Sequence, residues 1–364
     1  MTVARVLHVG PFSPPIDGGI SAYLDGLRRA AVVDRVALEA FDVHARGAER
    51  RSRVLRARLT VRLLWRFRSQ LSRTTAQLVH VHTSAHLGFW EKSLYGLVAA
   101  RHGFPFLLHV HGGDFDRFIM ELGPLQRRLA GRVFRAACGI IVLSQAWKHL
   151  FEPWVVPERL HVVPNAIHVA DFPAAVEPHN IERVRILFVG MLSARKGLDE
   201  LCLALVTLGD TTRPIDVEIV GGEEVPGDAA RYRQCFRQAG LTNVHFHGLL
   251  DADATREQLR RAHVFVLPSR SESFGIANLE AMACGLPVVS TRTGAIPEYI
   301  EHDVHGLLVD PGDAAGLARE LRRLIESPKL RQRLGAAARE RAQRFDWTVV
   351  GPQLESIYRR ILGL

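Results

Sequence analysis

Short apolar runs alternate with segments of helical periodicity along the whole chain of 364 residues. This alternation is typical of parallel β-sheets whose strands are joined by helices. The first half contains five apolar runs of strand length: Ala4–Val9, Leu78–Val81, Phe106–Val110, Gly139–Leu143 and Leu160–Val163. The second half contains five more: Val184–Val189, Asp216–Val220, Val244–Phe246, Val264–Leu267 and Pro287–Ser290. The pattern therefore predicts two α/β domains, each built on a parallel sheet.

The segment Ala170–Arg183 interrupts the periodicity between the two halves with two prolines and several polar residues. Such a composition is typical of a linker. We therefore expect a first domain over residues 1–170 and a second over 171–345. Helical patterns follow the last predicted strand at Ala314–Glu326, Lys329–Phe345 and Trp347–Leu364.

The composition is that of a folded protein, with 47% hydrophobic and 23% charged residues, and the length suffices for two packed domains. Its four cysteines lie far apart with no Cys-x-x-Cys pair, which indicates neither a disulfide framework nor a cysteine metal site. The first residues run directly into a strand pattern, and no apolar stretch approaches the roughly 18 residues of a membrane span. We therefore expect a cytoplasmic location.

The stretch PSRSESFGIANLEAMACGLPVVS, residues 268–290, places two carboxylates, Glu272 and Glu280, eight positions apart around a Phe-Gly turn that opens a helix. Glu272 falls in the loop before that helix, and Glu280 falls about one turn inside it. A carboxylate can accept hydrogen bonds from two vicinal hydroxyl groups, so the pair could hold a sugar ring and a ribose. The alternative is a capping glutamate and a solvated one.

Two further loops precede predicted helices. In VGMLSARKGLDEL, residues 189–201, Arg195 and Lys196 stand directly ahead of a helix, where cations and free backbone amides could converge on a diphosphate. Gly18 and Gly19 precede a helix that begins near Ile20 and would let a ligand approach the backbone. The alternatives are surface cations and a simple turn. The glycines do not form the G-x-G-x-x-G pattern, so a dinucleotide enzyme is not indicated.

The Glu272 stretch closely resembles the signature P-S-x-x-E-x-F-G-x-x-x-x-E-A-x-A-x-G-x-P-V of the retaining GT-B glycosyltransferases of family 4, the glycosyl transferases group 1 type. The resemblance implies that Glu272 contacts the transferred sugar and Glu280 the ribose of the nucleotide. Backbone amides of Phe274, Gly275 and Ile276 would face the donor. It also implies GT-B architecture, with two facing Rossmann-like domains and a final helix, 346–364, that crosses back to the N-terminal domain.

Other segments carry the same resemblance. The family pattern G-R-L-x-x-x-K-G is matched at Lys196 and Gly197, but Met191 stands where arginine is usual, and Arg195 could replace that guanidinium. HGGDF, residues 111–115, implies that His111 contacts the donor sugar. HFHGLL, residues 245–250, implies contacts from Gly248 and Leu250, and the Gly18–Gly19 loop would contact phosphate and acceptor.

Two His-x-His pairs, His80 with His82 and His109 with His111, suggest a different chemistry. Period-two alternation places each pair on one strand face, as in zinc hydrolases. A structural role at strand ends is the alternative, and we expect no metal.

Basic residues are concentrated in the segment from Arg46 to Arg73, which has ten arginines and one acid, within a chain of net charge +9. A basic amphipathic helix there could lie on an anionic membrane surface, or it could be a solvated face. No reader motif accompanies the charge, so we expect no nucleic-acid partner.

Together these features predict a metal-independent retaining hexosyltransferase without a cofactor, in which Arg195, Lys196 and helix-start amides stabilise a departing diphosphate. The donor would be a UDP- or GDP-sugar. The acceptor would be a lipid-linked oligosaccharide or polysaccharide precursor, at the inner face of the cell membrane. The alternatives are a sugar-nucleotide 2-epimerase of the same fold, a His-ligated metallohydrolase, and a non-catalytic carbohydrate- or membrane-binding protein.

Overall fold

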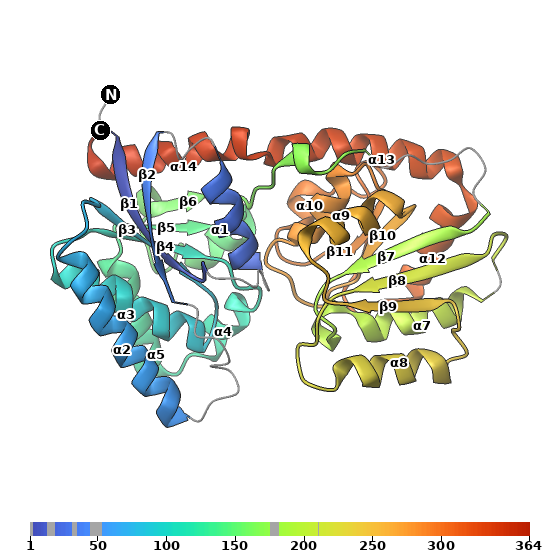
Figure 1. Ribbon diagram of the computed structural model, residues 1–364, viewed down its shortest axis with the longest axis horizontal. Helices are drawn as coiled ribbons and strands as arrows, with labels where there is room; N and C mark the ends of the chain where they lie inside the picture. The colour runs from blue at the N-terminus through green and yellow to red at the C-terminus, as the bar shows by residue number, and fades with distance from the viewer. Residues whose placement is uncertain (1–2, 13–18, 31–34, 44–52, 175–181, 210) are drawn as a thin grey trace. The chain divides into compact units, whose positions relative to one another are not determined.

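The computed structural model describes residues 3–12, 19–30, 35–43, 53–174, 182–209 and 211–364. The chain divides into two compact units, one made of residues 1–166 and 347–364 and the other of residues 167–346. Each unit contains a six-stranded sheet in which every strand pair is parallel (Figure 1). The predicted α/β class with two parallel sheets is confirmed, and the final helix belongs to the first unit, as predicted.

The first unit is built on a sheet of strand order β2-β1-β3-β4-β5-β6. Its strands are β1 (Ala4–Gly10), β2 (Val36–Asp42), β3 (Leu78–Thr83), β4 (Phe106–Val110), β5 (Gly139–Val142) and β6 (Leu160–Val162). Its helices are α1 (Gly19–Arg29), α2 (Arg53–Leu71), α3 (Leu87–Arg101), α4 (Phe115–Glu121), α5 (Pro124–Ala136), α6 (Gln145–Phe151) and α14 (Trp347–Leu362), with a 3-10 turn at Pro157–Arg159.

Alternate residues of these strands enter two separate apolar layers. Leu7, Val79 and Leu108 pack with residues of α2, α3 and α5 on one face of the sheet. Val6 and Leu78 pack with residues of α1 and α14 on the other face. Helices on both faces explain why the inner strands read as nearly continuous apolar runs.

The second unit is built on a sheet of strand order β12-β11-β10-β7-β8-β9. Its strands are β7 (Val184–Val189), β8 (Ile215–Val220), β9 (Val244–Gly248), β10 (Val264–Leu267), β11 (Val288–Thr291) and β12 (Leu307–Val309). Its helices are α7 (Leu198–Leu208), α8 (Asp228–Gln238), α9 (Ala252–Arg261), α10 (Ile276–Ala283), α11 (Ile296–Tyr299), α12 (Ala314–Glu326) and α13 (Pro328–Ala342). Short 3-10 turns lie at Val169–Asp171, Ala194–Lys196 and Gln343–Phe345.

The sequence pattern misses two strands, β2 and β12, and both lie at a sheet edge. β2 has the sequence VALEAFD and is buried at only two of its seven positions, so it lacks a continuous apolar run. β12 has only three residues. Edge strands have one neighbour and are weakly specified by burial. Within the described ranges, no helix combines the length and apolar character needed to span a membrane.

Candidate active site

The strand order of the second sheet changes direction beside β7, because β8 lies on one side of β7 and β10 on the other. In open α/β sheets, ligands bind at the carboxyl ends of the strands at such a point. The loop that carries Lys196 follows β7, and the loop that carries Glu272 follows β10. The topology therefore brings together two segments that the sequence separates by 76 residues.

The two loops are packed backbone to backbone. The Arg270 amide donates to the Arg195 carbonyl oxygen at 2.8 Å. Gly197 has φ 78°, and a Cβ atom there would lie 1.9 Å from the carbonyl oxygen of Pro268. Only glycine satisfies both conditions, so Gly197 allows the β7 loop to close onto the β10 loop.

Lys196 and Glu272 form a direct ion pair between these loops. Their side chains are 15% and 10% exposed, so the pair is largely shielded from water while each charge retains an opening to the surface. The Ser269 hydroxyl also donates to Glu272, at 3.3 Å. Thr291 at the end of β11 donates to the Ser269 carbonyl oxygen at 2.6 Å and fixes this loop to the next strand. The Glu272 carboxylate is thus held in place beside a cation.

Tyr299 fixes the turn from Phe274 to Ile276. The Tyr299 hydroxyl donates to the Phe274 carbonyl oxygen at 2.7 Å, and the two rings stack with centroids 5.1 Å apart. Gly275 has φ 79°, and a Cβ atom there would lie 2.9 Å from the Asn278 amide nitrogen. Ile276, the first residue of α10, is partly exposed. The amino end of α10 therefore reaches the surface next to the Lys196–Glu272 pair, where its free amides favour an anion.

Glu280 lies in the second turn of α10 and is partly buried. Burial raises the pKa of its carboxyl group to about 7, and the charge of Arg256 only partly opposes this rise. Ligand hydroxyl groups that donate to such a carboxylate stabilise its ionised form, because they replace the water that burial removes.

The remaining predicted donor residues lie along the same edge of the sheet. Arg195 pairs with Glu224 at 3.3 Å, so its guanidinium is directed toward the loop after β8. A Cβ atom at Gly222 would lie 3.9 Å from the Met191 methyl carbon and 3.8 Å from Leu249, so three loops meet there. Gly248 ends β9 with φ 74°, and the partly buried Leu250 follows it.

The predicted residues of the first unit lie at the carboxyl ends of its own sheet. His111 directly follows β4, and its amide donates to the Thr83 carbonyl oxygen at 2.9 Å. Its ring is 5% exposed, and its Nε2 atom lies 3.0 Å from His82 Nδ1. Gly19 opens α1 and is exposed, whereas Gly18 lies outside the described residues.

Sequence reasoning misses the residues that hold the site together, namely Ser269, Asn278, Thr291, Tyr299 and the ion pair of Arg270 with the buried Glu200. Two of these residues carry a signal, because Ser269 fills a fixed position of the P-S-x-x-E pattern. Asn278 is the other, since a polar residue within the apolar face of a helix is unusual. Among the described residues, two groups are compact enough to hold a metal ion: His8 with His80 and His82, and His82 with His109 and His111. Both groups belong to the first unit.

Comparison with known proteins gives one consistent result. Residues 14–166 match the glycosyl transferase 4-like domain, and residues 172–341 match glycosyl transferases group 1. Alpha-maltose-1-phosphate synthase of Mycobacterium tuberculosis is 30% identical over 329 residues, which span 79% of this chain and 80% of that protein.

Solved structures share the fold. Sucrose-phosphate synthase from Thermosynechococcus elongatus superposes with a TM-score of 0.82 at 21% identity, covering 99% of each chain. HepE from Anabaena, solved in complex with UDP-glucose, superposes with a TM-score of 0.73 at 21% identity, covering 97% of this chain and 98% of HepE. These comparisons do not support the epimerase or metallohydrolase alternatives. The chain belongs to the glycosyl transferases group 1 family and is a glycosyltransferase of GT-B architecture.

Proposed function

We propose that this enzyme is a retaining hexosyltransferase that moves a sugar from a UDP- or GDP-sugar to a lipid-linked oligosaccharide or polysaccharide precursor, without a metal ion at the reaction centre. The observation that carries the proposal is the shielded Lys196–Glu272 pair, which lies where β7 and β10 end and beside the amino end of α10. HepE was solved with UDP-glucose, so a UDP-sugar is the first donor to test.

The chemistry requires that negative charge on the departing diphosphate be stabilised. Lys196 can supply a fixed cation, and the first amides of α10 can supply oriented donors, as preorganised electrostatic catalysis requires. Donor binding would place sugar hydroxyl groups on Glu272, so that Lys196 is shared between that carboxylate and the diphosphate. Glu280 would accept from the ribose hydroxyl groups. His111 would meet the donor sugar from the first unit.

The proposal leaves no side chain in the role of nucleophile. The leaving phosphate would accept the proton of the acceptor hydroxyl group as the new bond forms on the same face of the sugar. That order of events retains the donor's α configuration. Proton NMR of the product formed from an α-linked donor tests it, because a β-linked product would contradict retention.

The donor and the metal requirement can be tested with the same preparation. A thermal-shift screen against UDP- and GDP-sugars should give one clear stabilisation, because a ligand far above its Kd raises stability by several kcal/mol. Turnover with that donor should persist in EDTA. Loss of turnover that added Mg²⁺ or Mn²⁺ restores would overturn metal independence.

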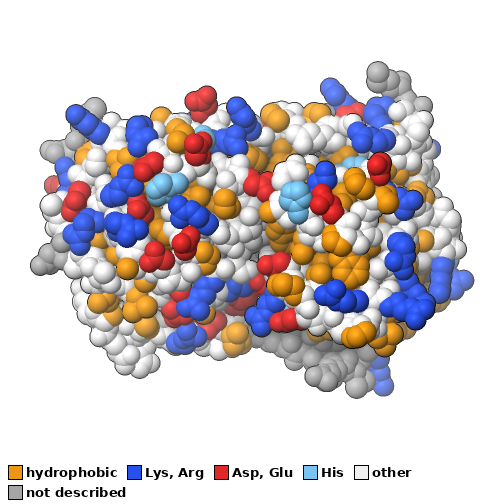
Figure 2. Space-filling model, turned by 180° about the vertical axis from the view of Figure 1, so that it is seen from behind, with side chains coloured by type: hydrophobic (Ala, Val, Ile, Leu, Met, Phe, Trp, Pro, Cys, Tyr) orange, Lys and Arg blue, Asp and Glu red, His pale blue; other side chains and the backbone are white. Residues whose placement is uncertain are grey.

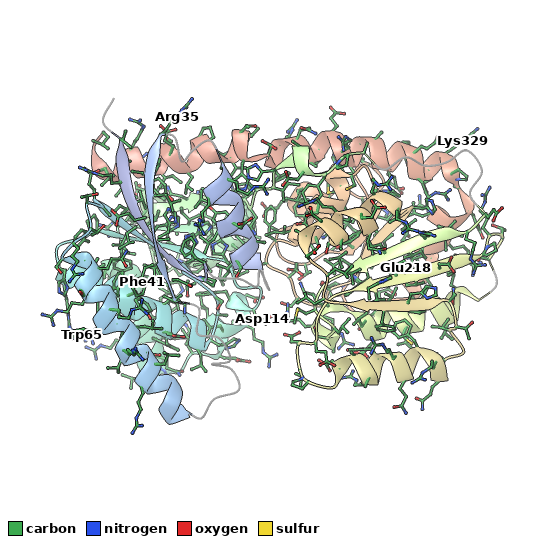
Figure 3. The ribbon with its side chains drawn as sticks, in the orientation of Figure 1. Arg35, Phe41, Trp65, Asp114, Glu218 and Lys329 are labelled. Atoms are coloured by element: carbon green, nitrogen blue, oxygen red, sulfur yellow. The ribbon has the colours of Figure 1, made fainter. Side chains whose placement is uncertain are left out.

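The anionic membrane surface is the second part of the proposal, and α2 is the element that supports it. Leu63, Phe67 and Leu71 are buried under this helix, while Val61 and Trp65 are 66% and 73% exposed. Trp65 projects from the helix in Figure 3, and the side chains of Arg58, Arg62, Arg66 and Arg68 are exposed on it. An exposed tryptophan among arginines suits a headgroup layer. Arg46, Arg50 and Arg51 lie outside the described residues.

The exposed arginines of α2 can be compared with the charged side chains on another face of the molecule. On the face drawn in Figure 2, Lys and Arg side chains are interspersed with Asp and Glu. Sedimentation with vesicles that contain anionic lipid should therefore exceed sedimentation with neutral vesicles and should weaken in salt. Trp65→Ser should reduce it, whereas Leu203→Ser, at a 59% exposed position of α7, should not. Equal partition into both vesicle types would reject membrane docking.

A further inference from the structure

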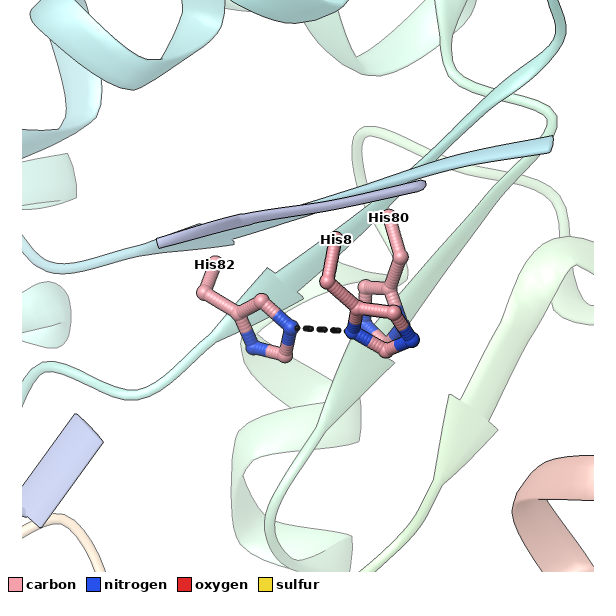
Figure 4. A group of neighbouring side chains, drawn as sticks. All are labelled: His8, His80 and His82. Atoms are coloured by element: carbon pink, nitrogen blue, oxygen red, sulfur yellow. Dashed lines mark hydrogen bonds between the residues drawn. The ribbon is translucent and has the colours of Figure 1, made fainter. Parts of the chain in front are cut away.

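Five buried histidines share one face of the first sheet. His8 lies in β1, His80 and His82 in β3, His109 in β4 and His111 directly after it, and all are at most 5% exposed. They continue the alternate positions whose earlier members, Val6, Leu78 and Leu107, pack against α1 and α14. Figure 4 shows three of the rings together beside β1 and β3.

The five rings and the Tyr358 hydroxyl form a single file of contacts, here called the imidazole chain. Its successive contacts are His109 Nδ1 to His80 Nε2 at 3.2 Å, His80 Nδ1 to Tyr358 OH at 2.6 Å, Tyr358 OH to His8 Nε2 at 3.4 Å, His8 Nδ1 to His82 Nε2 at 3.0 Å, and His82 Nδ1 to His111 Nε2 at 3.0 Å. Each inner ring uses both nitrogens. Tyr358 comes from α14, 278 residues after His80.

The two ends of the imidazole chain differ in their surroundings. Among the residues that the structure describes, the buried atoms His109 Nε2 and His111 Nδ1 have no hydrogen-bond partner. Within the same residues, the Oδ1 atom of the buried Asn165 also lacks a partner. The Asn165 side chain nevertheless acts on His111, since it opposes the fall in the pKa of that ring. The two side chains are thus close enough to interact, and each has one buried polar atom that remains to be paired.

The rings are neutral at pH 7. Burial lowers the pKa of His8 and of His111 to about 3, and burial together with the neighbouring imidazoles lowers the pKa values of the other three well below the usual range. A neutral imidazole carries one proton, so one of its nitrogens donates and the other accepts. Each contact in the file needs one proton.

Only two arrangements satisfy every contact of the imidazole chain and also use the Tyr358 hydroxyl proton within it; in a third, both His80 and His8 donate to Tyr358, whose own buried proton is then left without an acceptor. In one, all five rings carry the proton on Nε2, and the file ends in a buried His109 N–H group without an acceptor. In the other, all five carry it on Nδ1, and the last proton points from His111 to Asn165. Within the described residues, the only atom of the imidazole chain then left without a partner is His109 Nε2, which carries an unpaired lone pair. An unpaired buried donor is rarer in proteins than an unpaired acceptor, which favours the second arrangement.

We propose that Asn165 and Tyr358 are positioning residues that hold the imidazole chain in one direction, with the proton of His111 on Nδ1 and both nitrogens of that ring engaged inside the first unit. It follows that neither nitrogen of His111 is available to hydrogen-bond the donor sugar, so that the ring meets the sugar through its carbon edge, stays neutral and does not exchange protons in the reaction. The inference that His111 exchanges no proton in the reaction rests on the proposed function. The inference that its proton lies on Nδ1 does not.

A buried metal ion is the competing interpretation of the same cluster. Three imidazoles can bind zinc when one lone pair from each points at a common centre. Here His8 Nδ1, His82 Nε2, His82 Nδ1 and His111 Nε2 are instead arranged as facing pairs at hydrogen-bond distance. These contacts within the imidazole chain therefore favour hydrogen bonds between the rings over a bound metal ion.

Nitrogen NMR of the full chain with ¹⁵N-labelled histidine distinguishes these states without substrate. At pH 7, five of the 17 histidines should show Nδ1–H signals, assigned by replacing each ring in turn, and should not titrate between pH 6 and 8. A majority of Nε2–H signals among the five would overturn the proposal. So would one equivalent of zinc or another transition metal in the purified protein by mass spectrometry.

Two variants test the two positioning residues. Asn165→Leu removes the acceptor and leaves one unpaired N–H group in either direction, so the five rings should become mixtures of both tautomers. Tyr358→Phe divides the file, so His80 and His109 should become mixed while His8, His82 and His111 keep Nδ1–H. Tyr95→Phe is the control, because it removes a buried hydroxyl of the same unit that has no partner among the described residues, and it should leave all five signals in place. Unchanged tautomers in both test variants would overturn the positioning roles.

Discussion

The two units share a parallel α/β architecture but place opposite chemistry beside their first strands. In each sheet the strand order changes direction beside the unit's first strand, β1 or β7. The first unit places mutually hydrogen-bonded neutral bases along the strands there, whereas the second places Lys196 and Glu272 as a shielded ion pair. The parallel sheet thus supplies positions, and the buried side chains decide whether a position carries charge.

The same comparison predicts opposite responses to acid. The imidazole chain has pKa values below those of unfolded histidine, so an unfolded first unit binds more protons between pH 6.5 and about 3, and its stability falls as the pH falls through that range. Glu280 has a pKa raised to about 7, so its contribution to the second unit is favourable in acid and is lost as the pH rises from about 4.5 to 7.

Acid should therefore unfold the first unit first, which is the largest effect we expect. Each buried ring costs about 1.4 kcal/mol per pH unit below about 6.5, so five rings cost about 10 kcal/mol at pH 5, comparable to the stability of a whole domain. All five tryptophans lie within the sequence ranges of the first unit, so tryptophan fluorescence reports on that unit alone. Fluorescence should change cooperatively between pH 6 and 4.5.

Amide hydrogen exchange at the same pH provides the comparison with the second unit. Amides of β7 and β10 should remain protected when those of β1 and β3 have lost protection. Equal loss in both units, or unchanged fluorescence down to pH 4, would contradict the contrast between them.

Removal of the cation from the second unit should have the next largest effect, and it should fall on turnover. Lys196→Ala should lower kcat by about 10²–10³-fold, as the loss of one transition-state donor does elsewhere, with a smaller change in KM. Initial rates with the donor found by thermal shift measure both constants. Lys329→Ala removes an exposed lysine of the same unit, labelled in Figure 3, and should leave them unchanged. Equal kcat values in the two variants would remove Lys196 from the site.

Tyr358→Phe should lower stability by about 1–3 kcal/mol, because it leaves the His80 N–H group and the His8 lone pair without their shared partner. Tyr95→Phe deletes a buried hydroxyl for which the described part of the chain offers no partner, and it should leave stability nearly unchanged. Denaturant unfolding followed by tryptophan fluorescence compares the two variants in the same unit. An unchanged free energy of unfolding in Tyr358→Phe would show that the hydroxyl group contributes no net hydrogen-bond energy to stability.

The sequence predicts the interior of each sheet better than its edges. A strand covered on both faces, such as β5 or β10, is apolar along its length, and that requirement is visible in the residues. The edge strand β2 has no such requirement, and β12 is too short to form a pattern.

The candidate site divides in the same way. Adjacent strands β7 and β10 bring Lys196 to Glu272, so parallel topology suffices to expect their contact. The His-x-His alternation likewise predicts rings on one sheet face. It does not predict that Tyr358 joins them, because that contact depends on how a helix at the end of the chain lies on the sheet. Such a register is decided by packing, which one sequence does not display.

The raised pKa of Glu280 gives the smallest and most specific prediction. If ribose hydroxyl groups donate to this carboxylate, nucleotide binding requires its ionised form, and affinity should fall about tenfold per pH unit below about 7 and level off above it. Calorimetric titration with UDP and GDP between pH 6 and 8.5 measures this slope within the range where the first unit stays folded. The nucleotide phosphate also titrates near neutral pH, and Glu280→Gln separates the two, because it keeps the phosphate's contribution while removing the carboxylate's. Wild-type and Glu280→Gln affinities should therefore differ most above pH 7 and converge toward pH 6, and parallel curves would show that Glu280 does not bind the nucleotide through its charge.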